Sequence, residues 1–291
     1  MTWKRVATAV VLIPCVVALV LWGSTALVAI GIALVTLLAL FEFFALGDAI
    51  GHRAYRFWTA ICALGLVYVQ WLEVISPNHE LASGLTLEGP VLQYQGVRPA
   101  IQDVLFVFLV GVAALTLWTK RPKVEALPAA GISCSGLLLV ALPLTYAIPL
   151  HGIGRVGPML LMFVMVITWV GDTAAYFVGR AIGKHPLAPV LSPKKTWEGT
   201  VASILGALLV AVLFRKWLIV PLPHLLAMAT LGNMAGQAGD LLESAYKRSA
   251  GVKDSGSLLP GHGGVLDRID ALILAIPVVW YYWIWIYLPN R

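Results

Sequence analysis

Long apolar runs follow one another along nearly the whole chain. Stretches of about 18–22 residues, the length that an α-helix needs to cross a bilayer, give about nine candidate spans. They centre on residues 6–22, 26–46, 57–75, 103–119, 128–150, 158–178, 200–220, 224–242 and 270–288. Backbone groups in lipid must be hydrogen-bonded within their own segment, so each span is expected to be helical. The pattern predicts an all-α integral membrane protein, a polytopic bundle of about nine transmembrane helices.

Composition agrees with this prediction. Of the 291 residues, 60% are hydrophobic and 12% are charged, about half the charged fraction of a soluble domain. The net charge of +6 lies in short loops, where membrane topology accounts for it, so we expect no nucleic-acid partner. The run that follows Lys4 and Arg5 lacks a small-residue cleavage site, so we expect a retained first helix. The three cysteines match no metal-ligand spacing.

The basic residues predict how the chain lies in the membrane. With the N-terminus in the cytoplasm, 15 of the 20 Lys and Arg residues fall in inside loops. Arg215 and Lys216 are an exception, and they argue against the end assigned to the seventh span. The longest outside loop, residues 76–102, holds no chemical motif. We predict a multi-pass protein of a bacterial cytoplasmic (inner) membrane.

Polar residues divide the chain into two parts. Up to about residue 160 they are rare within spans, chiefly Glu42 and Glu73, each near a span end. Acids, bases and glycines crowd into the remainder. We therefore expect N-terminal scaffold helices over residues 1–160 and a catalytic region with a cytoplasmic-facing site over residues 161–291.

One acid lies near the cytoplasmic end of the sixth span. Asp172 is surrounded in sequence by apolar residues. A carboxylate at such depth is costly, so a functional role is the first interpretation. An ion pair with a neighbouring helix is the alternative.

A basic stretch, residues 192–199, precedes the seventh span. The Ser-Pro pair at its start predicts a turn, and Thr196 or Thr200 is expected to cap the next helix. Lys194 and Lys195, beside hydroxyl groups and a helix N-terminus, would form a phosphate cradle. A topogenic loop that touches lipid head groups is the alternative.

The segment from Gly239 to Asp270 is the strongest candidate for chemistry. Its first part has the spacing i, i+3, i+4, i+7 at Asp240, Glu243, Ser244 and Lys247. These residues share one face if the eighth helix continues through them. Two further acids, Asp267 and Asp270, stand three residues apart at the start of the ninth helix.

Acids and bases of this segment suit a phosphorylated substrate. Carboxylates that converge from separate helix ends can hold Mg²⁺, which prefers carboxylate oxygens and substrate phosphates. Phosphate oxygens would be neutralised by Lys247, Arg248, Lys253 and Arg268. The Pro-Gly-His-Gly-Gly run at 260–264 lets backbone approach a ligand closely, and His262 would either orient the loop or contact substrate.

The run from Ser244 to Asp270 resembles the signature of the phosphatidate cytidylyltransferase family. That signature reads Ser-x-apolar-Lys-Arg, four residues, Lys-Asp, then Pro-x-His-Gly-Gly-x-x-Asp-Arg-x-Asp. Every polar position is present here at the right spacing, and Tyr246 stands where the family usually carries Phe or an aliphatic residue. The stretch 192–199 and the Gly239-Asp240 pair also resemble family segments. The likeness is specific over about residues 168–271.

The resemblance implies a reaction in which CTP and phosphatidic acid give CDP-diacylglycerol and pyrophosphate. It implies Mg²⁺, with a monovalent cation such as K⁺ nearby, and Asp240, Asp270 and then Asp267 as metal ligands. The expected catalytic residues are Asp240, Lys247, Arg248, Lys253, Asp254, His262, Asp267, Arg268 and Asp270. The expected substrate-binding residues are Asp172, Ser192, Lys194, Lys195, Thr196, Glu198, Ser244, Gly263 and Gly264. The expected partners are CTP, phosphatidic acid and the lipid bilayer, and a homodimer is kept open.

Other function classes are weighed against this one. A transporter or channel would also carry intramembrane acids, but most charge here lies at one face and no convincing internal repeat is present. A CDP-alcohol phosphotransferase would need an Asp-Gly-x-x-Ala-Arg motif, which is absent. A CTP-dependent polyprenol kinase and an inactive scaffold that kept the motif stay open as alternatives.

Overall fold

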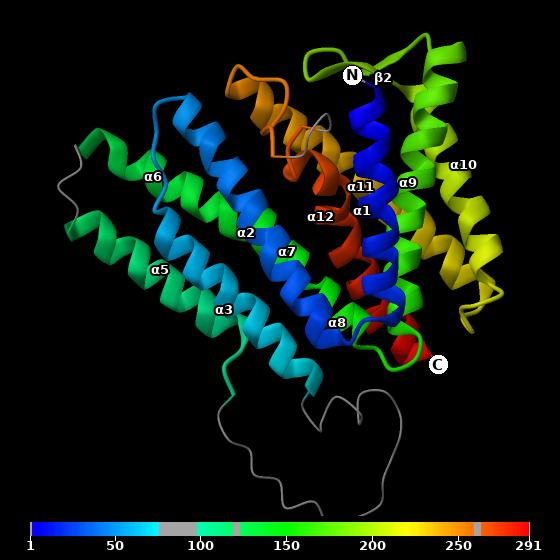
Figure 1. Ribbon diagram of the computed structural model, residues 1–291, viewed down its shortest axis with the longest axis horizontal. Helices are drawn as coiled ribbons and strands as arrows, with labels where there is room; N and C mark the ends of the chain where they lie inside the picture. Colours follow the sequence, from blue (N-terminus) through cyan, green and yellow to red (C-terminus); the bar gives the residue numbers. More distant parts are fainter. Residues whose placement is uncertain (1, 76–97, 119–122, 259–262, 291) are drawn as a thin grey trace, which may run out of the picture.

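The computed structural model describes residues 2–75, 98–118, 123–258 and 263–290. Over these residues the chain is almost entirely helical, and the helices form one bundle (Figure 1). The first part contains α1 (Thr2–Trp22), α2 (Thr25–Ala49), α3 (Arg56–Ile75), α5 (Ile101–Trp118), α6 (Lys123–Ser135), the π-helical η1 (Gly136–Ala141), α7 (Leu142–Thr145) and α8 (Ala147–His151). Most of the long loop predicted at 76–102 lies outside the described residues.

The second part contains longer helices and a small hairpin. Its elements are α9 (Gly157–Ile182), β1 (Pro186–Ala188), β2 (Ser192–Thr196), α10 (Trp197–Phe214), α11 (Leu222–Ser249), α12 (Leu266–Tyr282), the π-helical η2 (Trp283–Tyr287) and the 3₁₀ turn η3 (Leu288–Asn290). The strands β1 and β2 pair antiparallel, with Pro186 opposite Thr196 and Ala188 opposite Ser192.

The fifth predicted span is helical but interrupted. It runs from Glu125 to His151 as α6, η1, α7 and α8. Pro143 is the second residue of α7 and Pro149 lies in α8, and each proline lacks the N–H that a continuous helix needs. The π-helical η1 ends two residues before Pro143, so the irregular part of the span begins ahead of the first of these prolines.

Each predicted span overlaps helix among the described residues, and the predicted fold class is confirmed. Seven helical segments of the described residues are long and apolar enough to cross a membrane. The first span qualifies only as the shorter apolar helix Val10–Trp22 over the residues searched. The eighth, α11, is more polar because it carries Asn233, Gln237 and the acids of the candidate site. The chain is therefore a multi-pass helical membrane protein.

Apolar side chains cover the outside of the bundle as well as its interior. On α10, Val201, Leu205 and Leu209 are each more than half exposed and stand four residues apart, which places them on one face. An apolar helix face of this kind would be unfavourable in water and favourable against lipid.

The buried core has two main clusters that meet at α12. One joins α12 to α1, α9, α10 and α11, and the other joins it to α2, α3, α5 and the broken helix. Ala275 and Val279 belong to the first cluster, and Leu266 and Ile273 belong to the second. In Figure 1, α12 accordingly lies between the two groups of helices.

The polar segments of the second part lie at one end of the bundle. Figure 1 shows the β1–β2 hairpin, the connection from α11 to α12, the start of α1 and the connection from α2 to α3 at the same end. The turn between α10 and α11 lies at the opposite end. The seventh span was predicted to end at residue 220, and this end was wrong: α10 ends at Phe214, so Arg215 and Lys216 belong to that turn, as their charge had indicated.

Candidate active site

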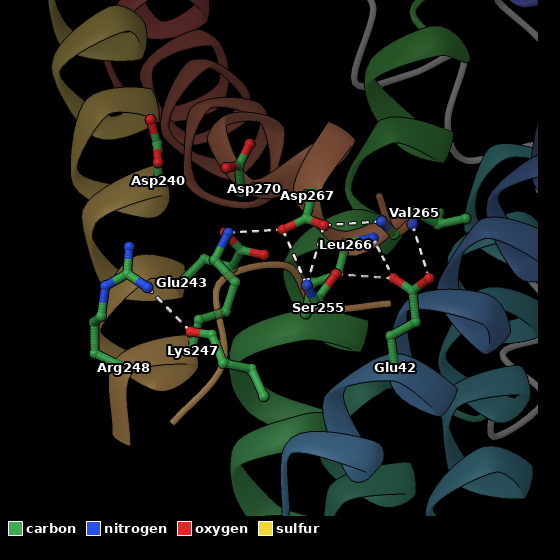
Figure 2. A network of polar contacts seen from close by, with 12 residues as sticks. Glu42, Asp240, Glu243, Lys247, Arg248, Ser255, Val265, Leu266, Asp267 and Asp270 are labelled. Atoms are coloured by element: carbon green, nitrogen blue, oxygen red, sulfur yellow. Dashed lines mark hydrogen bonds and ion pairs between the residues drawn. The ribbon is translucent and has the colours of Figure 1, made fainter. Parts of the chain in front are cut away.

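Three carboxylates from two helices converge at the polar end of the bundle. Asp240 and Glu243 come from α11 and Asp270 comes from α12, and one oxygen of each lies within 4.8 Å of the others (Figure 2). The eighth helix continues through this region to Ser249, so the condition under which its polar residues share one face is met. The cluster is therefore built by two packed helices rather than by loops.

Gly239 allows the two helices to come this close. A Cβ atom at this position would lie 2.4 Å from the backbone oxygen of Asp270. Only glycine avoids that clash, so the residue that precedes Asp240 sets the distance between α11 and α12.

Lysines flank the three carboxylates on two sides. The Nζ atom of Lys195 lies 2.6 Å from Oδ2 of Asp240, which joins strand β2 to α11. The Nζ atom of Lys247 lies 2.5 Å from Oε2 of Glu243 and 2.7 Å from Oδ1 of Asp267. Lys247 thereby connects the two helices through a pair of carboxylates.

Asp267 is held mainly by the connection between α11 and α12. Its carboxylate accepts hydrogen bonds from the backbone N–H groups of Gly264, at 2.8 Å, and Ser255, at 3.1 and 3.2 Å, besides the one from Lys247. These contacts stabilise the first turn of α12, where the negative charge of Asp267 also interacts favourably with the positive end of the helix dipole. The role of Asp267 as a metal ligand stays a prediction, and the geometry groups Glu243 with Asp240 and Asp270 instead.

The β1–β2 hairpin brings the basic stretch to the carboxylates. Thr196 caps α10 by accepting a hydrogen bond from the N–H of Gly199 at 3.2 Å, which confirms one of the two predicted caps. The turn predicted at Ser192 and Pro193 was wrong, because both residues lie in strand β2 and the turn precedes them. Pairing with β1 extends this segment, which lets Lys195 reach α11.

Glu198 holds the hairpin at its other end. Its carboxylate accepts hydrogen bonds from the backbone N–H of Lys184 at 3.1 Å and contacts Nδ1 of His185 at 2.7 Å. Glu198 thus binds the chain just before β1 and lies outside the group of three carboxylates.

Arg248 ties the hairpin to the connection between α11 and α12. Its guanidinium donates to the carbonyl oxygens of Leu191, at 3.3 Å, and Val252, at 3.1 Å. The two segments predicted to cooperate in phosphate binding therefore touch each other.

The remaining predicted residues fall into three groups. Exposed side chains of the same polar segments are those of Lys194, Lys253, Asp254 and Arg268. Ser244 is buried in α11, Gly263 and Gly264 lead into α12, and Asp172 on α9 interacts electrostatically with Asp240 and Lys195. His262 lies outside the described residues, so its two interpretations stay open.

The cluster carries more acids than bases. Within the described contacts five carboxyl groups stand against two ammonium groups, namely Asp172, Asp240, Glu243, Asp267 and Asp270 against Lys195 and Lys247. Neighbouring carboxylates repel one another when ionised, and a bound cation would offset this repulsion. The donor set suits a hard divalent cation such as Mg²⁺, because it consists of carboxylate oxygens.

Glu243 supports this fit. Its carboxylate is buried: Oε2 pairs with Nζ of Lys247 at 2.5 Å, and Oε1 has no hydrogen-bond partner among the described residues. A buried oxygen with unused lone pairs is unusual in proteins and can serve as a ligand. The sequence had placed Glu243 on the right helix face, but its role in the cluster was missed.

The fold and this site define a multi-pass helical membrane protein with an acid-rich, lysine-flanked site at one end of its bundle. Residues 3–286 match the sequence model of the cytidylyltransferase family. The chain belongs to that family, as its polar signature indicated.

Curated relatives agree with the family. The phosphatidate cytidylyltransferase of Haemophilus influenzae is 38% identical to this chain over 180 residues. The match covers 58% of this chain and 60% of the relative. The protein of that name in Bacillus subtilis is 41% identical over 138 residues, which cover 47% of this chain and 51% of the relative. The protein of the same name in Brucella suis is 41% identical over 182 residues, which cover 60% of this chain and 63% of the relative. Each match spans less than two thirds of the relative's length.

Proposed function

We propose that this protein transfers the cytidylyl group of CTP to phosphatidic acid, giving CDP-diacylglycerol and pyrophosphate in phospholipid biosynthesis. The observation that carries the proposal is the group Asp240, Glu243 and Asp270, flanked by Lys195 and Lys247 at one end of a membrane bundle. The relatives named phosphatidate cytidylyltransferase support the same reaction. A site at a helix end suits one lipid and one water-soluble substrate, because the acyl tails stay in the bilayer while the nucleotide arrives from water.

The proposed chemistry is an in-line displacement at phosphorus. A phosphate oxygen of phosphatidic acid forms a bond to the α-phosphorus of CTP, and the bond from that phosphorus to the bridging oxygen of the β-phosphate breaks. Pyrophosphate leaves with the electron pair. A phosphate monoester is largely dianionic near neutral pH, so no strong general base is needed. The principal barrier is repulsion between two anions.

Residues of this chain would lower that barrier by position and charge. Lys194 adjoins Lys195, Lys253 lies in the connection between α11 and α12, and Arg268 adjoins Asp267. All three are exposed and would bind phosphate oxygens. Lys195, now paired with Asp240, would lie between the acids and the nucleotide. Holding both substrates in line supplies much of the remaining rate enhancement.

A divalent cation is part of the proposal. Asp240, Glu243 and Asp270 would hold Mg²⁺, and Asp267 is a further candidate ligand. The bound cation would neutralise phosphate charge. Dependence on Mg²⁺ and a nearby K⁺ are proposed on the chemistry of the donors and on the family resemblance.

Topology, assembly and domain division complete the proposal. The site would face the cytoplasm of a bacterial inner membrane, since CTP is cytoplasmic and the basic loops share its end of the bundle. Residues 1–160 would act mainly as scaffold and residues 161–291 would carry the chemistry. A homodimer is kept as a prediction about assembly.

The test is an assay of purified protein with CTP, phosphatidic acid and Mg²⁺. We expect CDP-lipid and pyrophosphate in equal amounts, and loss of both when a chelator removes the metal. Label at the α-phosphate of CTP should enter the lipid, whereas label at the γ-phosphate should not.

Other outcomes would replace the proposal. Transfer of the γ-label to a lipid alcohol would indicate a kinase, and solute uptake into vesicles without consumption of CTP would indicate a transporter. Absence of CDP-lipid under every lipid and metal condition would overturn the assigned reaction.

A further inference from the structure

Glu42 is an acid of the first part of the chain that reaches the candidate site. It lies on α2 and is 1% exposed. Its Oε1 accepts a hydrogen bond from the N–H of Val265 at 2.9 Å, and its Oε2 accepts one from the N–H of Leu266 at 2.8 Å. Oε2 also accepts a hydrogen bond from Oγ of Ser255 at 3.1 Å (Figure 2). One buried carboxylate thus binds both the start of α12 and the segment before it.

The start of α12 needs such a partner. The first N–H groups of any helix have no acceptor within the helix, and the residue at the N-cap position here, Val265, makes no side-chain cap. Ser, Thr, Asp or Asn usually fills that role from within the same chain segment. Glu42 fills it from another helix, and its negative charge lies at the positive end of the α12 dipole.

The sequence of the loop leaves room for this carboxylate. A Cβ atom at Gly264 would lie 2.3 Å from Oε2 of Glu42, and one at Gly256 would lie 2.6 Å from Oε1. Larger residues at these two positions would push the acid away from the helix start. Gly256 and Gly264 therefore allow the loop to approach the carboxylate of Glu42 closely.

A continuous series of contacts leads from Glu42 to the carboxylate cluster. Ser255 donates its hydroxyl to Glu42 and its backbone N–H to Asp267. Asp267 binds Lys247, and Lys247 binds Glu243. Asp270 follows one turn after the residues that Glu42 holds.

We infer that Glu42 is a positioning residue for the site: it fixes the start of α12 and the adjoining loop so that Asp267 and Asp270 face α11. This inference rests on the proposed function for its kinetic consequences only. Glu42 acts through Val265, Leu266 and Ser255 and not by contact with a substrate. The first part of the chain thereby contributes a residue to the arrangement of the site.

The experiment compares Glu42→Gln, Glu42→Ala and wild type as purified full-length proteins. Glu42→Gln keeps the shape but places an NH₂ group against N–H and O–H donors. A displacement of about 1 Å can cost on the order of 100-fold in rate, so we expect kcat to fall ten- to a hundredfold. KM for CTP should change less than about threefold, because the exposed cations remain.

A second readout does not depend on activity. Lys253 is an exposed trypsin site in the segment that Glu42 holds through Ser255. We expect cleavage after Lys253, followed by mass spectrometry, to be several-fold faster in both Glu42 variants. Thr36→Val is the matched control, since Thr36 is buried on the same helix and its hydroxyl has no partner among the described residues.

The outcomes separate the two proposals. Wild-type kcat and wild-type cleavage in Glu42→Gln would overturn the positioning role, as would equal losses in Thr36→Val. If wild type itself forms no CDP-lipid, the proposed function fails while the cleavage rates still decide the role of Glu42. Should the Glu42 variants not fold, Ser255→Ala removes one of the same contacts and should show the same changes to a smaller extent.

Discussion

At the residue scale, Asp270 is the acid that α12 contributes to the group on α11. Asp270→Asn keeps its size but removes the charge and one acceptor oxygen. If the carboxylates hold a cation for the proposed reaction, turnover should fall by about 10²–10³-fold or more, with the protein still inserted in the membrane. The measurement is CDP-lipid formed per mole of purified protein.

Asp103→Asn is the matched control for this change. Asp103 lies in the first turn of α5, where it accepts a hydrogen bond from the N–H of Ala100, so it tests the loss of a helix-terminal charge away from the site. It should leave turnover within about twofold of wild type, because exposed caps contribute only about 1 kcal/mol to stability. Near-normal turnover in both Asp270→Asn and Asp240→Asn would remove the cluster from the reaction.

Lys247 gives a second prediction, which concerns stability. The side chains of its partners Glu243 and Asp267 are 5% and 6% exposed, so Lys247→Met would leave two buried carboxylates without their cation. Breaking a buried ion pair from one side costs about 3 kcal/mol or more. We expect a clearly lower melting temperature for the purified variant in detergent.

A double variant tests the cause of that loss. Adding Glu243→Gln to Lys247→Met removes one of the stranded charges and should recover part of the melting temperature. Lys216→Met, an exposed change in the turn between α10 and α11, should have no such effect. Equal melting temperatures for Lys247→Met and Lys216→Met would contradict the account of the ion pairs.

Sequence reasoning reached most of these residues but not all of their contacts. Helical spacing placed Asp240 beside Glu243, and the signature contained Asp267 and Asp270. Which acid joins the cluster depends on backbone donors: Gly264 and Ser255 bind Asp267, and Glu243 is left facing Asp270. Spacing along one helix contains no information about donors from a distant loop.

At the scale of elements, the distance between α11 and α12 decides whether the acids meet. In Gly239→Ala the new methyl group would lie 2.4 Å from a backbone oxygen of α12, so the helices must separate. Overpacking of this kind typically costs about 1–3 kcal/mol. Activity should fall at least about tenfold, because Asp240 moves away from Asp270.

Gly131→Ala is the control for Gly239→Ala. Gly131 lies in α6, and no heavy atom lies within 4 Å of where its Cβ would be. The same substitution there should be neutral or stabilising by up to about 1 kcal/mol, since alanine favours helix. Both proteins are compared by melting temperature and by CDP-lipid formation. Activity at the wild-type level in Gly239→Ala would contradict close packing as the determinant of the site.

The helices themselves were largely predictable, and the hairpin was not. Apolar length alone located the spans, because a membrane helix must satisfy its backbone within itself. The short strands β1 and β2 depend on pairing between residues 186–188 and 192–196, which contain lysines and prolines rather than a strand pattern. The break near Pro143 was also missed, since the apolar run continues through it.

At the scale of the whole molecule, the two parts of the chain are joined more closely than their polar content suggested. α12 packs against helices from both parts, and Glu42 binds its first turn. Glu42 and its partner Val265 are more than 200 residues apart in the sequence. The sequence places Glu42 near the end of a span, but it contains no information about which distant backbone groups this acid binds.

The arrangement of the ends gives the last prediction. The loops rich in Lys and Arg share one end with the site, and the turn at Lys216 lies at the other (Figure 1). Lys253→Cys and Lys216→Cys, each in a chain whose three native cysteines are replaced, put a single exposed thiol at either end. In intact spheroplasts a membrane-impermeant maleimide should label Lys216→Cys, and it should label Lys253→Cys only after the membrane is opened. The cysteine-free chain is the control for background labelling. The reverse pattern would put the carboxylate cluster on the outer face, away from cytoplasmic CTP, and would contradict both the predicted topology and the proposed source of the nucleotide.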